Sequence, residues 1–262
     1  MIITATTITL VLVASIYAYQ ILEQQRGATE FAVAKESILA FNDALENVAW
    51  KQGAVRSSRF TIEYGYLQLI PNGTQYGNTV IINATVDGGT ETLYILDNSN
   101  STGFIKYYLS NKYISFGQGY TSYILGSNGT LVVGSTGSYG RAVVEQKVQQ
   151  AGLVSITLDY RVRAMRTSVI NVTGTLVNYV DIWVIKLVTK DTSPWSYVHD
   201  FDLTARCLSI QTISYEWPSQ IPDGNATLSV QIGNAPSSSA DILLVAGKVV
   251  FNVIVAEVQV SV

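Results

Sequence analysis

The sequence MIITATTITLVLVASIYAYQILEQQRGATEFAVAKESILAFNDALENVAWKQG (residues 1–53) decides the fold of this chain. Residues 1–22 contain no charged side chain, and about 20 apolar residues are what a helix needs to cross a bilayer. Residues 23–53 are amphipathic and contain no proline. We therefore predict one continuous N-terminal helix, on the order of 75 Å long at 1.5 Å per residue.

The apolar part of this helix, residues 1–22, needs either lipid or further copies of itself to cover its side chains. The side chains expected to make these contacts are Ile3, Ile8, Leu10, Val11, Leu12, Val13, Ile16, Tyr17 and Ile21. Signal peptides begin with a positively charged segment, whereas no Lys or Arg precedes Arg26 here. We expect that a charged leader is removed by processing, which would make Met1 the mature N-terminus.

The amphipathic part carries apolar side chains at alternating steps of three and four residues. We call them the seam residues: Phe31, Ala34, Ile38, Phe41, Leu45 and Val48. A narrow apolar stripe on one face of a helix packs against a partner surface. We expect the seam to pack on the rest of the chain, so that residues 1–22 protrude. Gly27 is the weak point of the helix, and Gly53 suits its C-terminal end.

From residue 54 to residue 262 the apolar pattern changes to a period of two, typical of half-buried strands. Turns rich in Gly, Asn and Ser separate these segments. We predict an α+β fold, in which the long hydrophobic helix (1–53) precedes an antiparallel head (54–262) of the β-sandwich type. The expected strands cover residues 60–64, 67–69, 79–86, 91–96, 157–164, 180–188, 206–215 and 249–262.

Two segments of the head have a different pattern. Residues 97–140 are rich in Gly, Ser, Asn and Tyr, and we interpret them as hairpins and long loops whose outward face is a contact surface. Residues 143–150 have the only spacing after residue 52 that is compatible with another helix.

The composition gives little support for catalysis or for nucleic-acid binding. Charged residues make up 13% of the chain, against about 25% in an average soluble protein, and the net charge is −3, so no basic footprint is present. The only histidine, His199, and the only cysteine, Cys207, lack metal-ligand spacing around them. His199 precedes Asp200, but no GxSxG context accompanies them. We expect no enzyme activity, no metal and no cofactor, and a buried thiol at Cys207.

Six Asn-x-Ser/Thr sequons make N-linked glycans an expected modification. Several fall in predicted turns, where a transferase could reach them, and glycans would supply the hydrophilic cover that few charges provide. The alternative is that they are ordinary turn asparagines. The candidates are Asn72, Asn83, Asn100, Asn128, Asn171 and Asn225.

An uncharged N-terminal helix that runs into an amphipathic helix and then into a β-rich head resembles the archaeal type IV pilins, a superfamily that includes the archaellins. The resemblance rests on residues 1–53, on VRSSRFTIEYGYLQL (55–69) and on the β-rich remainder, and it is closest to the crenarchaeal type. Bacterial type IV pilins usually carry a glutamate at the fifth mature position, where this chain has Ala5. The departure favours the archaeal group.

The resemblance implies a structural subunit of an extracellular filament used for surface adhesion. A prepilin peptidase would remove the leader, and residues 1–22 would hold the subunit in the membrane before assembly. An assembly ATPase and a membrane platform protein would then move it into a helical homopolymer, in which the apolar helices bundle at the centre.

Two alternatives remain open from the sequence. The first is an archaellin of a motility filament. The second is a monomeric, membrane-anchored binding protein whose β-sandwich recognises surfaces or sugars through tyrosines. The tyrosines considered for that role are Tyr107, Tyr108, Tyr113, Tyr120 and Tyr123.

Overall fold

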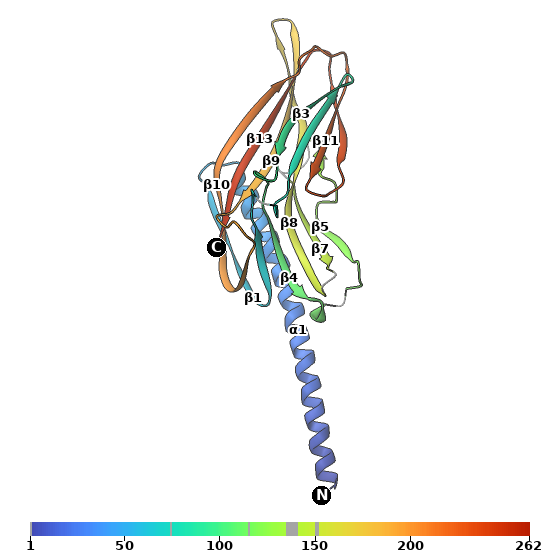
Figure 1. The fold of residues 1–262 in the computed structure, drawn as a ribbon, viewed down its shortest axis with the longest axis vertical. Coiled ribbons are helices and arrows are strands. Elements are labelled where there is room, and N and C mark those ends of the chain that lie inside the picture. Colours follow the sequence, from blue (N-terminus) through green and yellow to red (C-terminus); the bar gives the residue numbers. More distant parts are fainter. Residues whose placement is uncertain (1, 74, 115, 135–140, 150–151) are drawn as a thin grey trace.

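The fold consists of one long helix that protrudes from an elongated head built of strands (Figure 1). A computed structural model describes the chain except for residues 1, 74, 115, 135–140 and 150–151. The predicted α+β class is confirmed. The elements are α1 (Ile2–Ala49), β1 (Val55–Ile70), β2 (Val80–Val86), β3 (Gly89–Leu96), β4 (Phe104–Ser110), η1 (Asn111–Tyr113), β5 (Thr121–Leu125), β6 (Leu131–Val133), β7 (Arg141–Val148), β8 (Leu153–Val172), β9 (Thr175–Val188), β10 (Trp195–Glu216), β11 (Gly224–Ile232), β12 (Ser238–Leu244) and β13 (Lys248–Ser261).

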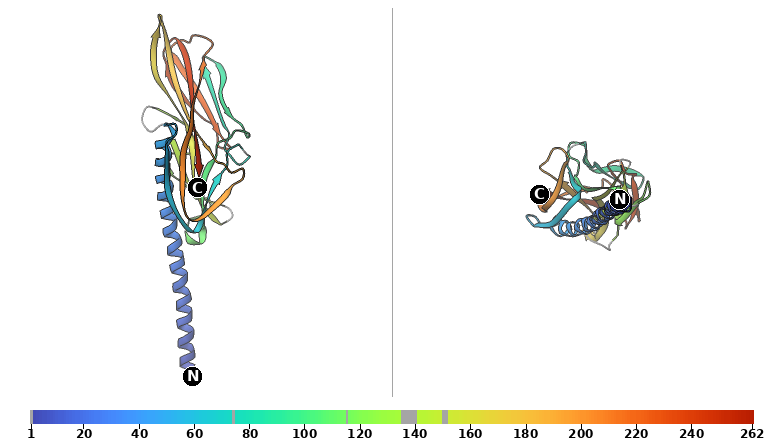
Figure 2. Two further views of the ribbon diagram at one scale, coloured as in Figure 1. Left: turned by 90° about the vertical axis from the view of Figure 1, so that its left-hand side faces the viewer. Right: turned by 90° about the horizontal axis from the view of Figure 1, so that it is seen from below.

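The helix α1 runs unbroken for 48 residues, through Gly27. Its N-terminal half lies clear of the head, and its C-terminal half lies along one flank of the head's lower part (Figure 2). The chain leaves the helix at a turn in which Gly53 has a φ of 78°, a conformation that glycine adopts without strain. It then enters β1, which turns back beside the helix (Figure 2).

The larger sheet closes on itself, because β4 pairs with β1 on one side and with β8 on the other. Six strands thereby form a ring in the order β4-β1-β10-β13-β9-β8. β7 and β6 also pair with β8, and β5 pairs with β7. Because of this closure, the β-sandwich predicted for the whole head is not confirmed.

A second sheet of four strands, in the order β12-β11-β2-β3, covers the upper half of the larger sheet. β13 shows how the layers are arranged. Between Val249 and Val255, the side chains on one face of β13 pack against the four-stranded sheet. Farther along the strand, Ala256, Val258 and Val260 pack in the core that contains the seam residues of the helix. Successive side chains of a strand point to opposite faces. The helix and the small sheet therefore cover opposite faces of β13 at different heights.

Two expectations for the head are wrong. Residues 143–150 form no helix in the part that the structure describes, because residues 141–148 are β7, paired with β8 along its whole length. Residues 97–140 are more than hairpins and loops, because they include β4, the strand that closes the ring. The expected turn after residue 86 is confirmed as the two-residue connection Asp87-Gly88 between β2 and β3, with both residues at positive φ.

Candidate assembly surface

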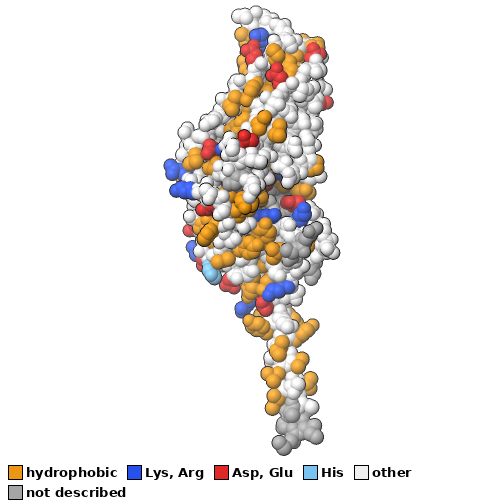
Figure 3. Space-filling model, in the orientation of Figure 1, with side chains coloured by type: hydrophobic (Ala, Val, Ile, Leu, Met, Phe, Trp, Pro, Cys, Tyr) orange, Lys and Arg blue, Asp and Glu red, His pale blue; other side chains and the backbone are white. Residues whose placement is uncertain are grey.

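The protruding part of α1 presents an uncharged, mainly apolar surface to the surroundings. Every described side chain from Thr6 to Leu22 is exposed, and Leu10 reaches 70% exposure. Figure 3 shows these hydrophobic side chains along the rod below the head. By length and composition the helix could cross a membrane. Globular proteins rarely leave a large apolar patch exposed unless it binds a partner or a membrane.

The structure places the predicted contact residues on this protruding part. The exposed ones are Ile8, Leu10, Val11, Leu12, Val13, Ile16, Tyr17 and Ile21. The side chain of Ile3 lies outside the described residues. The exposed side chains lie on all sides of the helix, so no single face of this segment is reserved for one neighbour.

All six seam residues are buried, and each is at most 6% exposed. They share one hydrophobic core with side chains of β1, β4, β8, β10 and β13. Ring contacts strengthen this attachment, since Phe41 meets Phe60 edge-on with ring centroids 6.4 Å apart. The seam therefore fixes the head on the helix and leaves the lower part of the helix free for other contacts.

A buried carboxylate, Glu30, joins the helix to β1 and β4. Its Oε2 accepts hydrogen bonds from the backbone N–H groups of Glu63 (2.8 Å) and Tyr64 (2.7 Å). Its Oε1 accepts from the N–H of Gly65 and from the Tyr107 hydroxyl, both at 2.8 Å. Hydrogen bonds to an ionised acceptor are roughly twice as strong as neutral ones. We call this arrangement the Glu30 clamp.

The clamp exists because the register of β1 shifts between Ile62 and Leu67. The shift takes the intervening N–H groups off the ladder with β10, and buried N–H groups need another acceptor. Gly65 is required for the close approach, because a Cβ there would lie 2.5 Å from the Tyr107 hydroxyl. The sequence signal was Gly65 interrupting an alternating strand, but its partner Glu30 lies 35 residues away and was not identified.

A second contact fixes the point at which the helix leaves the head. Glu23 accepts hydrogen bonds from the Tyr113 hydroxyl (3.1 Å) and from Lys112 Nζ (3.4 Å). The Lys112 ammonium also lies 4.5 Å from the centre of the Tyr113 ring. Gly27, expected to be a weak point, instead provides space: a Cβ there would lie 2.9 Å from Tyr113 Cβ and closer still to the ring.

The Gly27→Ala variant should lose stability although alanine favours helices. The helix gains about 1 kcal/mol from the exchange, whereas overpacking costs about 1–3 kcal/mol, so we expect a lower unfolding temperature. The measurement is thermal unfolding of the full chain in mild detergent. The double variant Gly27→Ala, Tyr113→Gly should unfold no lower than Tyr113→Gly alone, because glycine at position 113 removes both the ring and the Cβ that a Cβ at position 27 would meet. A Gly27→Ala variant that melts above the parent would contradict this packing.

Two buried tyrosines contact the helix, and a half-buried tyrosine, Tyr94, lies in the four-stranded sheet. Tyr160 donates to Asn42 Oδ1 at 2.9 Å, and burial raises its pKa well above the ordinary value. Burial also raises the pKa of Tyr107, and the Glu30 carboxylate raises it further. Burial raises the pKa of Tyr94 to about 12, with a further contribution from Glu257. All three are held as neutral phenols in the folded state.

Alkaline pH should therefore unfold the head cooperatively. A folded-state pKa above the unfolded value near 10 means that the stabilisation is complete below pH 10 and is lost as pH rises through the folded pKa, about 12 for Tyr94. Circular dichroism should change in one step above pH 10, and the part of the tyrosinate absorbance that comes from these three phenols should appear in the same step. Gradual ionisation of all tyrosines around pH 10 with the fold intact would contradict the prediction.

An open groove extends the exposed surface of α1 upward beside β1. It consists of two hollows of about 640 and 630 Å³ that share Thr29 and Val33. Ala32 and Ala40 also line it, and Val33 is 47% exposed. The exposed face of a surface helix is usually charged or polar. Here the lining is mixed: these small and apolar side chains alternate with charged ones, which include Arg26, Lys35, Glu36, Arg59 and Glu63.

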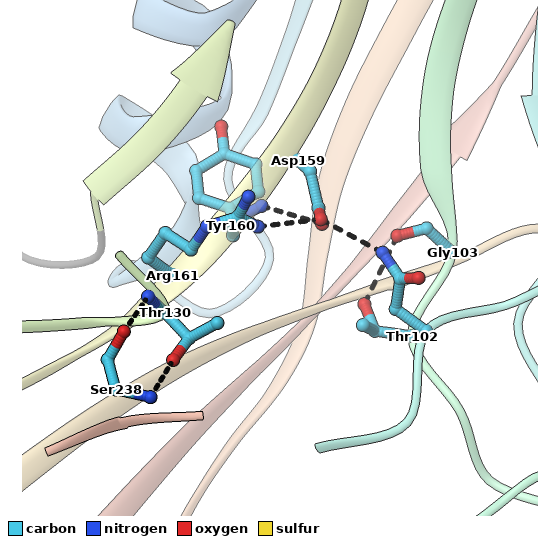
Figure 4. A network of polar contacts seen from close by, with 8 residues as sticks. Thr102, Gly103, Thr130, Asp159, Tyr160, Arg161 and Ser238 are labelled. Atoms are coloured by element: carbon cyan, nitrogen blue, oxygen red, sulfur yellow. Dashed lines mark hydrogen bonds and ion pairs between the residues drawn. The ribbon is translucent and has the colours of Figure 1, made fainter. Parts of the chain in front are cut away.

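A polar network in the interior of the head connects loops to β8 by hydrogen bonds (Figure 4). Asp159 accepts from Arg161 Nη1 (2.8 Å), from Asn78 Nδ2 (2.9 Å) and from the N–H of Tyr160 (2.8 Å). Asn78 in turn exchanges two backbone hydrogen bonds with Thr102. Burial raises the pKa of Asp159, and the Arg161 charge opposes that effect. The carboxylate oxygens of Asp159 are thus occupied by hydrogen bonds within the head. Through Asn78 and Thr102, the network fixes the segment before β2 and the segment after β3.

His199, Asp200 and Cys207, the residues considered for catalysis or metal binding, all lie in β10. His199 is exposed and has a φ of 66°, and Asp200 forms an ion pair with Arg59 at 3.3 Å. Cys207 is fully buried, with Sγ 3.3 Å from the carbonyl oxygen of Ala49. Among the described residues no group of three or more His, Cys, Asp or Glu side chains could hold a metal ion.

Two of the five tyrosines considered for surface binding are buried. Tyr107 is fully buried in the Glu30 clamp, and Tyr113 is 7% exposed against the helix. Tyr108 is half-buried. Tyr120 and Tyr123 are 39% and 38% exposed. The assignment of Tyr107 and Tyr113 to a binding surface is therefore wrong, because both pack where the helix meets the head.

All six sequon asparagines lie on the head, and none lies on α1 or β1. Four are exposed: Asn100, Asn128, Asn171 and Asn225. Asn72 and Asn83 are half-buried. The assembly surface formed by the helix is thus separate in the chain from every sequon.

No protein-family model, no curated protein and no solved structure matches this chain.

Proposed function

We propose that this protein is the structural subunit of an extracellular filament of the archaeal type IV pilus kind, used for surface adhesion. The observation that carries the proposal is the fully exposed apolar segment from Thr6 to Leu22 on a helix whose other half is anchored in a β head. Copies of the segment bundle at the filament centre, and the heads form the outer layer.

The energetics favour such a polymer. Fully burying a large apolar side chain stabilises by about 1.5–3 kcal/mol relative to water, and each subunit contributes several exposed ones. Before assembly the same segment resides in the membrane, where lipid is equally apolar. Transfer into the bundle then depends on close helix packing, to which the small residues Ala32 and Ala40 in the flank groove contribute.

The partners in this proposal are further copies of the chain, a membrane before assembly, a prepilin peptidase, an assembly ATPase with its platform protein, and N-linked glycans on the head. The filament is located on the cell surface. The role requires no cofactor and no nucleic acid. Within the head, we assign the region where the four-stranded sheet packs on β8, β9 and β13 to the β-sandwich type.

A shearing experiment tests the proposal. Cells are sheared without detergent, and the released material is sedimented and analysed by mass spectrometry. A filament subunit should appear in the high-speed pellet and remain there after washing. A membrane-anchored binding protein would instead stay with the cells until detergent is added, and that result would contradict the proposal.

A further inference from the structure

The asparagines within sequons differ from most other asparagines of the chain in the hydrogen bonds of their side-chain amides. Asn78, Asn178 and Asn252, outside sequons, donate from Nδ2 to protein acceptors. Asn178 does so twice, to the carbonyl oxygens of residues 245 (2.8 Å) and 248 (3.0 Å). An N-linked sugar replaces one of the two hydrogens on Nδ2, so Asn178, which donates both of them to the protein, has none left for a glycan.

Asn100 has the opposite arrangement. Its Oδ1 accepts from Lys186 Nζ at 2.6 Å, and within the described part of the chain its Nδ2 donates to no protein atom. Lys186 is 9% exposed, and an ammonium group has donors only, so the amide oxygen must face it. Reversing the amide would leave a buried charge without its acceptor, which is costly. The orientation of Asn100 is thereby fixed with Nδ2 outward.

Asn171 is oriented by the backbone in the same way. Its Oδ1 accepts from the N–H of Gly174 at 2.9 Å, a group that can only donate. Gly174 and Thr173 both have positive φ and form the tight turn of the β8–β9 hairpin. The tip of this hairpin lies at the far end of the head from the N-terminus (Figure 1). Asn171 is exposed, so its Nδ2 is open to the surroundings.

From these geometries we infer that Asn100 and Asn171 carry N-linked oligosaccharides. Asn72 also presents only Oδ1, to the N–H of Thr189, and Asn83 presents Oδ1 to Thr92. Both are half-buried, which leaves Asn100 and Asn171 as the sites where orientation and exposure agree. The inference rests on the proposed function only in requiring a head that is displayed outside the cell.

The modification is a group transfer from an oligosaccharide carried on a lipid phosphate. The bond between the anomeric carbon and the phosphate oxygen breaks, and the phosphate leaves with the electron pair. Nδ2 bonds to the anomeric carbon and loses one proton, which the leaving phosphate takes up through solvent. The amide oxygen keeps both lone pairs, so the hydrogen bonds from Lys186 and Gly174 survive the modification.

Glycopeptide mass spectrometry of the full chain from its native cell surface tests the inference. Peptides containing Asn100 and Asn171 should carry a glycan mass, and the variants Asn100→Gln and Asn171→Gln should each lose one glycan. An unmodified peptide at either position overturns the assignment of that site. The glycan mass on a peptide can be measured whether or not the variant folds.

The variant Val180→Thr supplies a matched control, because it creates a sequon at Asn178, whose Nδ2 donates both hydrogens, to the carbonyl oxygens of residues 245 and 248. Asn178 should stay unmodified in the folded chain, and a glycan there would overturn the orientation argument. Electron microscopy of the same samples separates this inference from the proposed function. Filaments with bare Asn100 and Asn171 would overturn the inference alone, whereas glycosylated chains that form no filaments would overturn the proposed function alone.

Discussion

The Leu12→Asp variant should form no filaments while its head stays folded. Leu12 lies in the middle of the protruding apolar segment, 58% exposed and far from the seam. An Asp at the centre of an apolar helix costs about 2.5–3.5 kcal/mol on insertion into a membrane, and an uncompensated charge in a dry helix bundle is also expensive. The cost recurs in every subunit, so no length of polymer compensates for it.

The measurement is electron microscopy of sheared cell-surface material, together with the amount of subunit in the membrane fraction. Leu12→Met, which keeps nearly the same volume, should leave filaments unchanged. Protease resistance of the head should match the parent in both variants, because Leu12 is exposed on the protruding part of α1. Filaments at the parental level with Asp at this position would show that the protruding segment is not the polymer core.

The Glu30→Ala variant should lose a large part of the stability of the fold. Four donors, three N–H groups of β1 and the Tyr107 hydroxyl, would lose their acceptor inside the protein. A buried donor left without a partner costs about 1–3 kcal/mol, so the loss is a large share of a typical stability of about 5–15 kcal/mol. Glu30→Gln should lose less stability than Glu30→Ala but should not match the parent. The amide oxygen of glutamine can still accept hydrogen bonds, whereas its amide nitrogen is a donor and cannot replace the second carboxylate oxygen.

Urea unfolding of the full chain in mild detergent measures this effect. Glu36→Ala is the matched control, since Glu36 is another glutamate of α1 but is exposed. Its midpoint should change little, whereas the midpoint of Glu30→Ala should fall clearly. Equal midpoints for the two variants would mean that the Glu30 clamp contributes nothing to the attachment of the head.

The helix and most strands could be predicted because their signals are local. The period of 3.5 in the seam from Phe31 to Val48 and the alternation along β13 are each contained in one segment. The site of attachment could also be anticipated from the seam. The protruding segment was evident from its lack of charge alone.

Ring closure and the Glu30 clamp could not be predicted in the same way. The register that joins Ile105 to Leu158 depends on pairing across 53 residues, and alternation alone does not choose the partner strand. Glu30 follows the polar pattern of an exposed helix face, and only the displaced N–H groups of β1 make it a buried acceptor. Tyr107 was misassigned to a surface for the same reason, since its partner was unknown.

Electron cryo-microscopy of filaments released from cells without detergent tests the central claim most directly. We expect a helical reconstruction with a central bundle of α-helices, into which the segment from Thr6 to Leu22 fits, surrounded by β-rich heads. Discrete particles that require detergent, or filaments whose core is formed by the heads, would contradict it.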